Sequence, residues 1–303
     1  MTGGAGFIGS HLVDSLVADG HRVRVLDDLS TGQRRNLHPG VELIVGDIAD
    51  PATVAAAMAG IDGVFHLAAV ASVARGNEDW FGTHRINQSG TVAVLDAARA
   101  AGRVPVVYAS SAAVYGDVGA AVAREDRPPN PATAYGADKL GSELHARVGS
   151  HIHGVPTLGL RFFNVYGPRQ DPSSPYSGVI SIFSRQLAKG HPILLHGDGR
   201  QTRDFVHVSD VVAHLKAALD QLNANPAVAG RVLNVCTGRA VAIQDVALLL
   251  VQQRGTTPVL EYAAPRPGDI RHSRGGPEQA SATLGVTAKM PLEDGLASLD
   301  LLE

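Results

Sequence analysis

The chain has little that would tie it to a membrane, a nucleic acid or an oxidising compartment. Cys236 is the only cysteine among 303 residues, which excludes an intramolecular disulfide. It has no run of about 18 apolar residues and no charged-then-apolar leader. Basic residues are not in excess, since the formal net charge is -3 and the pI is about 6.5. We therefore expect a cytoplasmic protein that acts on a small molecule and binds neither nucleic acid nor membrane.

The chain is instead rich in residues that build an α/β core. Hydrophobic residues make up 45% of it, enough for one large domain or two lobes. In the first half, short β-branched runs alternate with Ala- and Leu-rich helical stretches, a pattern typical of strand–helix units on a parallel sheet. This pattern predicts an α/β fold with a doubly wound parallel Rossmann sheet, whose ligands bind beyond the carboxyl ends of the strands. The expected strands are 21–26, 41–45, 63–67, 104–109 and 157–162, and the expected helices lie near 10–19, 51–59, 83–101 and 135–148.

The alternation changes after Gly167-Pro168, where a loop rich in Pro, Ser and Gly covers 171–178. This change predicts a smaller C-terminal α/β lobe. We expect residues 1–166 to form the first domain, to which segments around 204–238 return, and residues 167–303 to form mainly the second lobe. Further helices are expected at 179–189, 210–221 and 242–253, and further strands at 193–196 and 231–235.

A glycine-rich loop opens the chain as Gly3-Gly4-Ala5-Gly6-Phe7-Ile8-Gly9. Glycines with this spacing ahead of a helix let the backbone approach a pyrophosphate, whose charge then sits on free N–H groups. The pattern needs a strand in front of it, and Met1-Thr2 is too short to be that strand. In this fold the first strand lies between the second and the fourth, which would otherwise keep unpaired backbone groups. We therefore expect that about five or six residues, the usual strand length, precede Met1 in the natural protein.

Two carboxylates support a dinucleotide ligand. Asp27 lies at the end of the expected strand 21–26, which is the second strand if the one expected ahead of Met1 is counted, and it follows Gly9 by 18 residues. An acidic side chain there accepts hydrogen bonds from the adenosine ribose and repels a 2′-phosphate, which favours NAD over NADP. Asp47 lies at the end of the expected strand 41–45 and can reach the adenine amine, although such an aspartate is more often a turn former or a helix cap.

A tyrosine and a lysine four residues apart, Tyr135 and Lys139, would share one face of a helix. A lysine charge beside a phenol stabilises the phenolate and lowers its pKa, which predicts a general base for a sugar hydroxyl. On spacing alone, an exposed helical pair is at least as good an interpretation. Tyr135 follows Ser111 by 24 residues, and Ser110-Ser111 end an expected strand at the same edge of the sheet. Ser111 could relay the substrate proton, and the alternative is two turn serines.

Together these motifs resemble the extended short-chain dehydrogenase/reductase family, in its group of sugar-nucleotide epimerases and dehydratases, and most of all its UDP-hexose 4-epimerases. The resemblance covers nearly the whole chain. Besides the segments above, the residues that carry it are Leu26-Asp27-Asp28-Leu29-Ser30-Thr31-Gly32, His66-Leu67-Ala68-Ala69, Arg161-Phe162-Phe163-Asn164-Val165-Tyr166-Gly167-Pro168, Gly197-Asp198-Gly199-Arg200-Gln201-Thr202-Arg203-Asp204-Phe205 and Arg266-Pro267-Gly268-Asp269.

The resemblance implies NAD as the cofactor and no metal. It assigns one set of residues to each part of the cofactor, and Lys139 would bond the nicotinamide ribose beside Tyr135. The residues expected at the pyrophosphate are Gly3, Gly6, Phe7, Ile8 and Gly9; those at the adenosine are Asp27, Asp28, Ser30, Thr31, Gly32, Asp47 and Ile48; and those at the nicotinamide are Leu67, Ala68, Ala69, Ala71, Asn87 and Phe163.

The resemblance also implies the substrate-binding residues. Ser111 and Tyr135 would meet the sugar, and Asn164, Arg203 and Arg266 would hold the diphosphate, where arginine suits bidentate contacts. Without the resemblance, both arginines would be taken as surface residues. Asp269 belongs to the same motif as Arg266. Val179 and His196 match positions near a uracil, with an ordinary core or loop role equally open. Ser273 matches the position that limits room around the 2-substituent of the sugar, and its small size predicts that N-acetyl sugars are accepted.

The implied activity is NAD-dependent 4-epimerisation of a UDP-hexose, UDP-galactose or UDP-glucose and also the N-acetyl forms, through a transient 4-keto intermediate. Ser111, Tyr135 and Lys139 would be the catalytic residues. Related dehydratases and decarboxylases carry an acid at the position of Ala112 or Ala113, which this chain lacks. The alternatives are an epimerase or reductase of a dTDP-, GDP- or UDP-uronic acid sugar, and a non-catalytic NAD-binding regulator. The resemblance further implies a homodimer through the helices 83–101 and 135–148.

Overall fold

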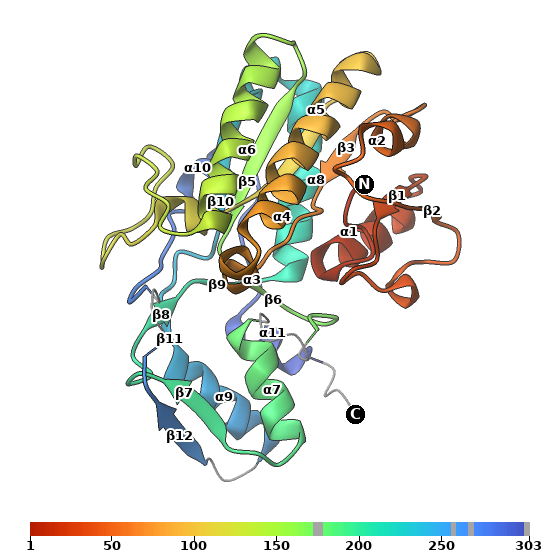
Figure 1. Ribbon diagram of the computed structural model, residues 1–303. Coiled ribbons are helices and arrows are strands. Elements are labelled where there is room, and N and C mark those ends of the chain that lie inside the picture. The colour runs from red at the N-terminus through yellow and green to blue at the C-terminus, as the bar shows by residue number, and fades with distance from the viewer. Residues whose placement is uncertain (172–177, 256–258, 266–269, 300–303) are drawn as a thin grey trace.

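The computed structural model describes residues 1–171, 178–255, 259–265 and 270–299, and its larger part is built on a parallel sheet (Figure 1). The strands of this sheet follow the order β2, β1, β3, β4, β5, β10, with Thr2 bridging β1 and β3. All their pairings are parallel, so the expected doubly wound Rossmann sheet is confirmed. The strands are β1 (Arg24–Asp27), β2 (Glu42–Val45), β3 (Val64–His66), β4 (Val106–Ser111), β5 (Thr157–Phe162) and β10 (Arg231–Val235).

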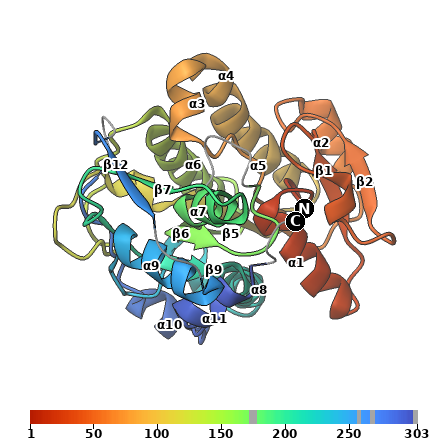
Figure 2. The same ribbon diagram turned by 90° about the horizontal axis from the view of Figure 1, so that it is seen from below.

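Helices cover both faces of this sheet, as Figure 2 shows from below. On one face, Val54, Val94 and Ala146 pack with strand residues in one apolar core. On the other face, Leu12, Leu215 and further strand residues form a second core. The first face is covered by α2 (Pro51–Ala57), α5 (Gly90–Ala100) and α6 (Ala134–His151), and the second by α1 (Phe7–Ala18), α8 (Val208–Ala224) and α10 (Glu278–Leu284).

The expected helix 83–101 is divided in the structure. It begins in α4, continues through a π-helical turn, and ends in α5. A π-helical turn is rare and is frequently found at functional sites. Short elements near it and in the loops are α3 (Val73–Glu78), α4 (Trp80–His84), η1 (Arg34–Asn36), the π-helix η2 (Arg85–Ser89), η3 (Ala112–Tyr115) and η4 (Pro226–Val228).

The first residues of the chain take the place of a strand between β1 and β3. Thr2 N donates to Phe65 O at 3.0 Å, and Gly3 N donates to Leu26 O at 2.9 Å. Leu26 N donates in turn to Met1 O at 2.8 Å. These contacts pair part of the backbone that was expected to stay unpaired. The expectation of further residues ahead of Met1 stays a prediction.

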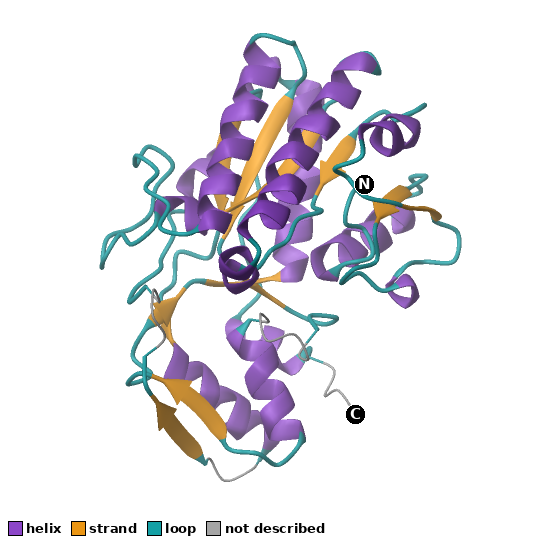
Figure 3. Cartoon of the chain, in the orientation of Figure 1, coloured by secondary structure: helices purple, strands orange, loops and turns teal. Residues whose placement is uncertain are grey.

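The remaining elements gather at the carboxyl edge of the sheet (Figure 3). They surround a third apolar core, which includes Phe183, Leu195 and Leu250. The chain passes between this region and the sheet more than once, because β10 joins β5 after the lobe has begun. The division at residue 166 stays a prediction. The elements of this region are β6 (Asn164–Tyr166), α7 (Val179–Ala188), β7 (Ile193–His196), β8 (Thr202–Arg203), β9 (Phe205–His207), β11 (Val241–Ala242), α9 (Ile243–Arg254), β12 (Leu260–Ala263) and α11 (Leu292–Ala297).

No helix in the described ranges is long and apolar enough to cross a membrane.

Candidate active site

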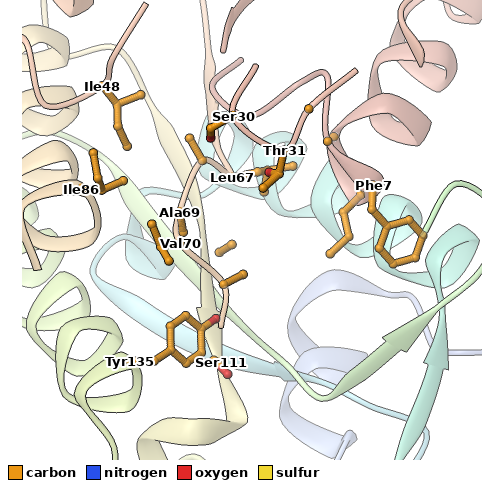
Figure 4. Close-up of a pocket in the computed structure, with 18 of the residues that line it drawn as sticks. Phe7, Ser30, Thr31, Ile48, Leu67, Ala69, Val70, Ile86, Ser111 and Tyr135 are labelled. Atoms are coloured by element: carbon orange, nitrogen blue, oxygen red, sulfur yellow. The ribbon is translucent and has the colours of Figure 1, made fainter. Parts of the chain in front are cut away.

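A cavity of about 670 Å³ opens at the carboxyl ends of β1, β3, β4 and β5. Its size is ordinary for a cofactor or ligand site. In Figure 4, Tyr135 and Ser111 lie together at one end, away from Ser30 and Ile48. Of the expected cofactor and catalytic residues, the cavity is lined by Gly3, Gly6, Phe7, Ile8, Gly9, Asp27, Asp28, Ser30, Thr31, Gly32, Asp47, Ile48, Leu67, Ala68, Ala69, Ala71, Ser111, Tyr135, Lys139 and Phe163.

The glycine loop leads into a helix start that can bind an anion. Gly6 is the N-cap of α1, no side chain caps this end, and its first turn holds no acidic residue. The first N–H groups of such a helix lack internal partners and carry the positive end of its dipole. A Cβ on Gly9 would lie 2.1 Å from Gly3 O, so only glycine lets the helix approach the loop this closely. The loop therefore fits a pyrophosphate.

Asp27 is held at the carboxyl end of β1 by backbone groups. Its Oδ2 accepts a hydrogen bond from Ala5 N, and its Oδ1 accepts one from Leu29 N, both at 2.9 Å. Burial raises the pKa of Asp27, and these two bonds oppose that rise. A Cβ on Gly32 would lie 2.6 Å from Asp27 Oδ1, so the next turn passes close to the carboxylate. The lone pairs left on Asp27 fit the hydroxyls of an adenosine ribose.

Asp47 and Arg85 join two segments that line the cavity. Arg85 Nη2 lies 2.8 Å from Asp47 Oδ2. Asp47 Oδ1 also accepts a hydrogen bond from Ala49 N at 2.8 Å. Asp47 thus acts as a turn former, which was one of the two interpretations of the sequence, and it also lines the cavity.

Tyr135 lies in the first turn of α6, whose start is fixed by the side chain of Thr133. Thr133 Oγ1 accepts a hydrogen bond from Gly136 N at 3.1 Å, an N-cap. Ser111 ends β4, and its Oγ accepts a hydrogen bond from Ala113 N at 3.1 Å. Burial raises the pKa of Tyr135, and its side-chain hydrogen bond with Ser111 opposes that rise. Two hydroxyls from different elements therefore meet inside the cavity.

Lys139 lies one turn along α6, with its ammonium group directed at the backbone of β4. Its Nζ donates to Ala109 O at 2.9 Å and lies 5.8 Å from the ring centroid of Tyr135. Burial lowers the pKa of Lys139 to about 8, while Asp138 and Glu143 oppose that change. Burial dominates the pKa of Tyr135 here, and the Lys139 ammonium donates to Ala109 O. The expected lowering of the Tyr135 pKa by Lys139 stays a prediction.

Asn87 supports the cavity wall from behind rather than lining it. Its Oδ1 accepts a hydrogen bond from Val70 N at 2.8 Å, and its Nδ2 donates to Val70 O at 3.2 Å. Asn87 is buried, and these two bonds fix the loop after β3. Its expected contact with the nicotinamide stays a prediction.

Several expected substrate residues lie away from this cavity. Val179 begins α7 and packs against the third apolar core, and His196 lines a separate cavity of about 470 Å³. Arg203 Nη1 donates to Thr202 O at 2.8 Å, and Ser273 is buried with its N–H bonded to Thr202 O. Asn164 lines the main cavity. Arg266 and Asp269 lie outside the described residues. The roles of all these residues toward a substrate stay predictions.

Some lining residues escape sequence reasoning. They come mainly from α3, α4 and the π-helical turn, which carry no motif. Thr83 is the most notable, because it is buried and its Oγ1 has no hydrogen-bond partner among the described residues. The helical spacing of Thr83 and Ile86 was the available signal, since residues three apart share a face. The missed lining residues include Val70, Arg75, Asp79, Gly82, Thr83, Arg85, Ile86, Gln170 and Gly178.

Within the described ranges, no group of three or more His, Cys, Asp or Glu residues is placed to hold a metal ion.

Comparisons with known proteins agree with this geometry. A family model described as "NAD dependent epimerase/dehydratase family" matches residues 1–236. A UDP-glucose 4-epimerase of Mycolicibacterium smegmatis is 39% identical, over 98% of this chain and 95% of its own. The solved UDP-glucose 4-epimerase of Thermotoga maritima with UDP-glucose is 34% identical, with a TM-score of 0.90 over 98% of this chain and 95% of its own. That of Thermus thermophilus with NAD is 36% identical, with a TM-score of 0.88 over 97% and 95%. The chain belongs to the NAD dependent epimerase/dehydratase family.

Proposed function

We propose that this protein is a UDP-hexose 4-epimerase, which interconverts UDP-galactose and UDP-glucose through a 4-keto intermediate with NAD as cofactor. The observation that carries the proposal is that Ser111 and Tyr135 lie together in the same cavity as the glycine loop and Asp27. A non-catalytic NAD-binding regulator would need the loop and the carboxylate but not this pair. The relatives named as UDP-glucose 4-epimerases support the same assignment.

Each catalytic residue has a role that follows from its place. Tyr135, as phenolate, takes the proton of the sugar 4-hydroxyl, and Ser111 bridges the two oxygens. Lys139 would hold and orient the nicotinamide ribose. Bound NAD supplies the acceptor and later the donor of the C4 hydride. Asn164 and the expected arginines hold the diphosphate, so the ketose can turn and present its other face.

The placement of the acidic side chains around the cavity favours epimerisation over elimination. Ala112 and Ala113, which follow Ser111 in η3, carry no acid. Among the described residues, the carboxylates that line the cavity are Asp27, Asp28, Asp47 and Asp79, and none of them lies on β4, η3 or α6. No acid therefore comes from the elements that carry the two catalytic hydroxyls, and return of the hydride is the route left to the ketose.

The substrate range and the division of the chain are part of this proposal. Ser273 is small, and it would leave room for an N-acetyl group at the 2-position of the sugar. Residues 1–166, with segments of 204–238, would hold NAD, and residues 167–303 would form mainly the nucleotide-sugar lobe. The UDP-sugar is the expected small-molecule partner, and the cytoplasm is the expected location.

A homodimer is also part of the proposal, and exposed apolar side chains support it. Leu144, Val148 and Ile152 are 55%, 46% and 74% exposed and follow one another at four-residue spacing along α6 and its C-cap, Ile152. Phe81 on α4 is 81% exposed. An apolar row of this kind on a surface helix is typical of a contact with another subunit. A second copy of the chain, meeting this one through α5 and α6, would cover it.

The test is conversion of UDP-galactose to UDP-glucose by the purified protein without added reductant. Wild type should convert it, and Tyr135→Phe should lose about 10²- to 10⁴-fold in rate, the usual contribution of a general base. Tyr262→Phe, at a tyrosine on β12 that is 55% exposed, is the matched control and should keep full activity.

A panel of UDP-, dTDP- and GDP-sugars completes the experiment. Turnover of only dTDP- or GDP-sugars would replace the UDP assignment. NAD binding without turnover of any nucleotide sugar would replace the enzyme by a regulator.

A further inference from the structure

A buried hydroxyl on α5 joins three segments that meet behind the cavity. Thr91 is 3% exposed, and its Oγ1 donates a hydrogen bond to Asn87 O, in the π-helical turn, at 2.6 Å. The same oxygen lies 3.1 Å from His66 Nε2 on β3 and 3.1 Å from Ser142 Oγ on α6. Three partners fill the one donor site and two acceptor sites of a hydroxyl. Thr91 therefore connects β3, the π-helical turn and α6.

One branch of these hydrogen bonds leads to the loop 67–71, which follows β3 and lines the cavity. His66 Nδ1 lies 2.8 Å from Thr2 Oγ1, and that oxygen accepts a hydrogen bond from Ala68 N at 3.2 Å. Both His66 and Thr2 are buried. The loop is thus tied to Thr91 through two buried side chains.

The π-helical turn supplies a second connection to the same loop. Asn87, whose carbonyl oxygen accepts the Thr91 hydrogen bond, also bonds both backbone groups of Val70 through its side-chain amide. A buried hydrogen bond is costly to lose when nothing replaces it. The loop is therefore held on both sides of Ala69, and Thr91 supports both connections.

The third partner of Thr91 lies on the face of α6 that carries the catalytic residues. Tyr135, Lys139 and Ser142 follow one another at spacings of four and three, which places them on one face of the helix. Ser142 is 2% exposed, and α5 and α6 lie side by side on the sheet (Figure 1). The hydrogen bond between the two hydroxyls therefore joins this face of α6 to the loop 67–71.

We propose that Thr91 is a positioning residue, which holds the catalytic face of α6 at a fixed distance from the loop 67–71. The inference rests on the proposed function, in which Tyr135 acts on the sugar and the loop lies at the nicotinamide. When the 4-hydroxyl is oxidised, its proton goes to Tyr135, the C4 hydride goes to bound NAD, and the carbonyl forms between them. Both acceptors must therefore stand correctly about one C–O bond, and a misplacement of about 1 Å can cost on the order of 10²-fold in rate.

Thr157 on β5 offers a matched comparison. It is fully buried, its Oγ1 donates to Ala146 O of α6 at 3.0 Å, and the same oxygen lies 2.8 Å from Ser150 Oγ. These contacts lie about two turns or more beyond Lys139 along the helix. Thr157→Val thus removes a buried hydroxyl that bonds the same helix, away from its catalytic residues. It should lower the urea midpoint of unfolding about as much as Thr91→Val does.

The first measurement is backbone hydrogen exchange, followed by mass spectrometry without any nucleotide sugar. Thr91→Val keeps the shape of the side chain and lacks the hydroxyl, so exchange in 67–71 and 135–142 should become about tenfold faster than in wild type. Thr91→Ser, which restores the hydroxyl, should stay close to wild type. Thr157→Val should speed exchange at 146–157 and leave 67–71 unchanged.

The second measurement is turnover of UDP-galactose that carries hydrogen or deuterium at C4. In Thr91→Val, kcat per mole of bound NAD should fall by about 10- to 100-fold with little change in KM. The deuterium isotope effect on kcat should be at least as large as in wild type, because the hydride step is the one that is slowed. Thr91→Ser should restore kcat, and Thr157→Val should keep it, since a loss of folded protein alone does not change kcat per bound NAD.

Three outcomes would each overturn the proposal: unchanged exchange of 67–71 in Thr91→Val, an unchanged kcat per bound NAD, or equal effects in Thr157→Val. If Thr91→Val does not fold, Ser142→Ala removes the α6 side of the same junction and decides by the same two measurements. A wild type that turns over no nucleotide sugar would overturn the proposed function instead. The hydrogen exchange would then still decide whether Thr91 holds the loop 67–71 against α6.

Discussion

The buried ion pair between Arg161 and Glu143 offers a direct test of how the catalytic wall is held. Arg161 on β5 donates to Glu143 on α6 through Nε at 2.8 Å and Nη2 at 2.7 Å. Ser110 Oγ donates to the same carboxylate, and the guanidinium lies 4.6 Å from the ring centroid of Tyr115. Both charged side chains are nearly fully buried. The pair thus ties β4, β5 and α6 together directly behind Ser111 and Tyr135.

The expected magnitude comes from what each substitution leaves behind. Arg161→Met removes one partner and leaves the Glu143 charge buried, which should lower the free energy of unfolding by about 3–5 kcal/mol. Glu143→Leu strands the guanidinium and should cost a similar amount. The double variant buries no charge and leaves only the Ser110 hydroxyl without its partner, which costs about 1–3 kcal/mol. The double variant should therefore be more stable than either single variant.

The assay is urea unfolding of wild type, both single variants and the double variant, followed by far-UV circular dichroism. The coupling energy is the cost of the double variant minus the two single costs, and it should be negative by several kcal/mol. A double variant whose cost equals the sum of the singles would refute the reasoning, because the two charges would then act independently. Arg161→Met with a cost below about 1 kcal/mol would refute it as well.

Four further predictions follow from other parts of the structure. Gly9→Ala should weaken NAD binding by at least about tenfold in calorimetric titration, since the new Cβ would lie 2.1 Å from the carbonyl oxygen of Gly3. Unchanged affinity would contradict the role of the glycine loop in binding the pyrophosphate. Burial lowers the pKa of His66 to about 3, so the stability that neutral His66 contributes is lost as pH falls from about 6.5 toward 3. At pH 5 this loss is about 2 kcal/mol, and His66→Gln should show a correspondingly smaller drop in unfolding free energy between pH 7 and pH 5, whereas an equal drop would exclude His66 as its source. Val148→Asp should halve the mass measured by light scattering, while the control Leu248→Asp, at an exposed position on α9, should not; equal masses would argue against the α6 interface. Ser273→Tyr should lose turnover of the N-acetyl UDP-sugar and keep that of UDP-galactose, and identical kinetics would remove Ser273 from the substrate pocket.

Local patterns were sufficient to predict the sheet and the cofactor end of the site. The strands expected at 157–162 and 231–235 coincide with β5 and β10, most of whose residues are buried, as in a parallel sheet covered on both faces. The glycine loop and Asp27 also lie where expected, since both follow from the turn between a strand and a helix. These features depend on a few neighbouring residues, so the sequence carries them directly.

Features made by distant pairing were not predictable in the same way. The short strands β6 and β9 pair with each other across about forty residues, and neither has a pattern of its own. Thr83 and Arg85 line the cavity from α4 and from the π-helical turn that follows it. Val179 and His196 were expected beside a uracil, and their positions depend on how the smaller lobe is folded. Spacing along the chain cannot report such placements, because tertiary packing sets them.

Tyr135 and Lys139 show most clearly where spacing stops being informative. Four residues on a helix place the phenol and the ammonium on one face, and the structure agrees. The spacing does not say which acceptor the ammonium chooses, and Ala109 O takes it. Burial then raises the pKa of Tyr135, with only the Ser111 hydrogen bond acting against it. An oxidised nicotinamide ring carries a positive charge, so Tyr135 should give up its proton more readily when that ring is in the cavity than when it is not. The base would thus be formed where the hydride acceptor is already in place, which ties proton removal to the presence of the cofactor.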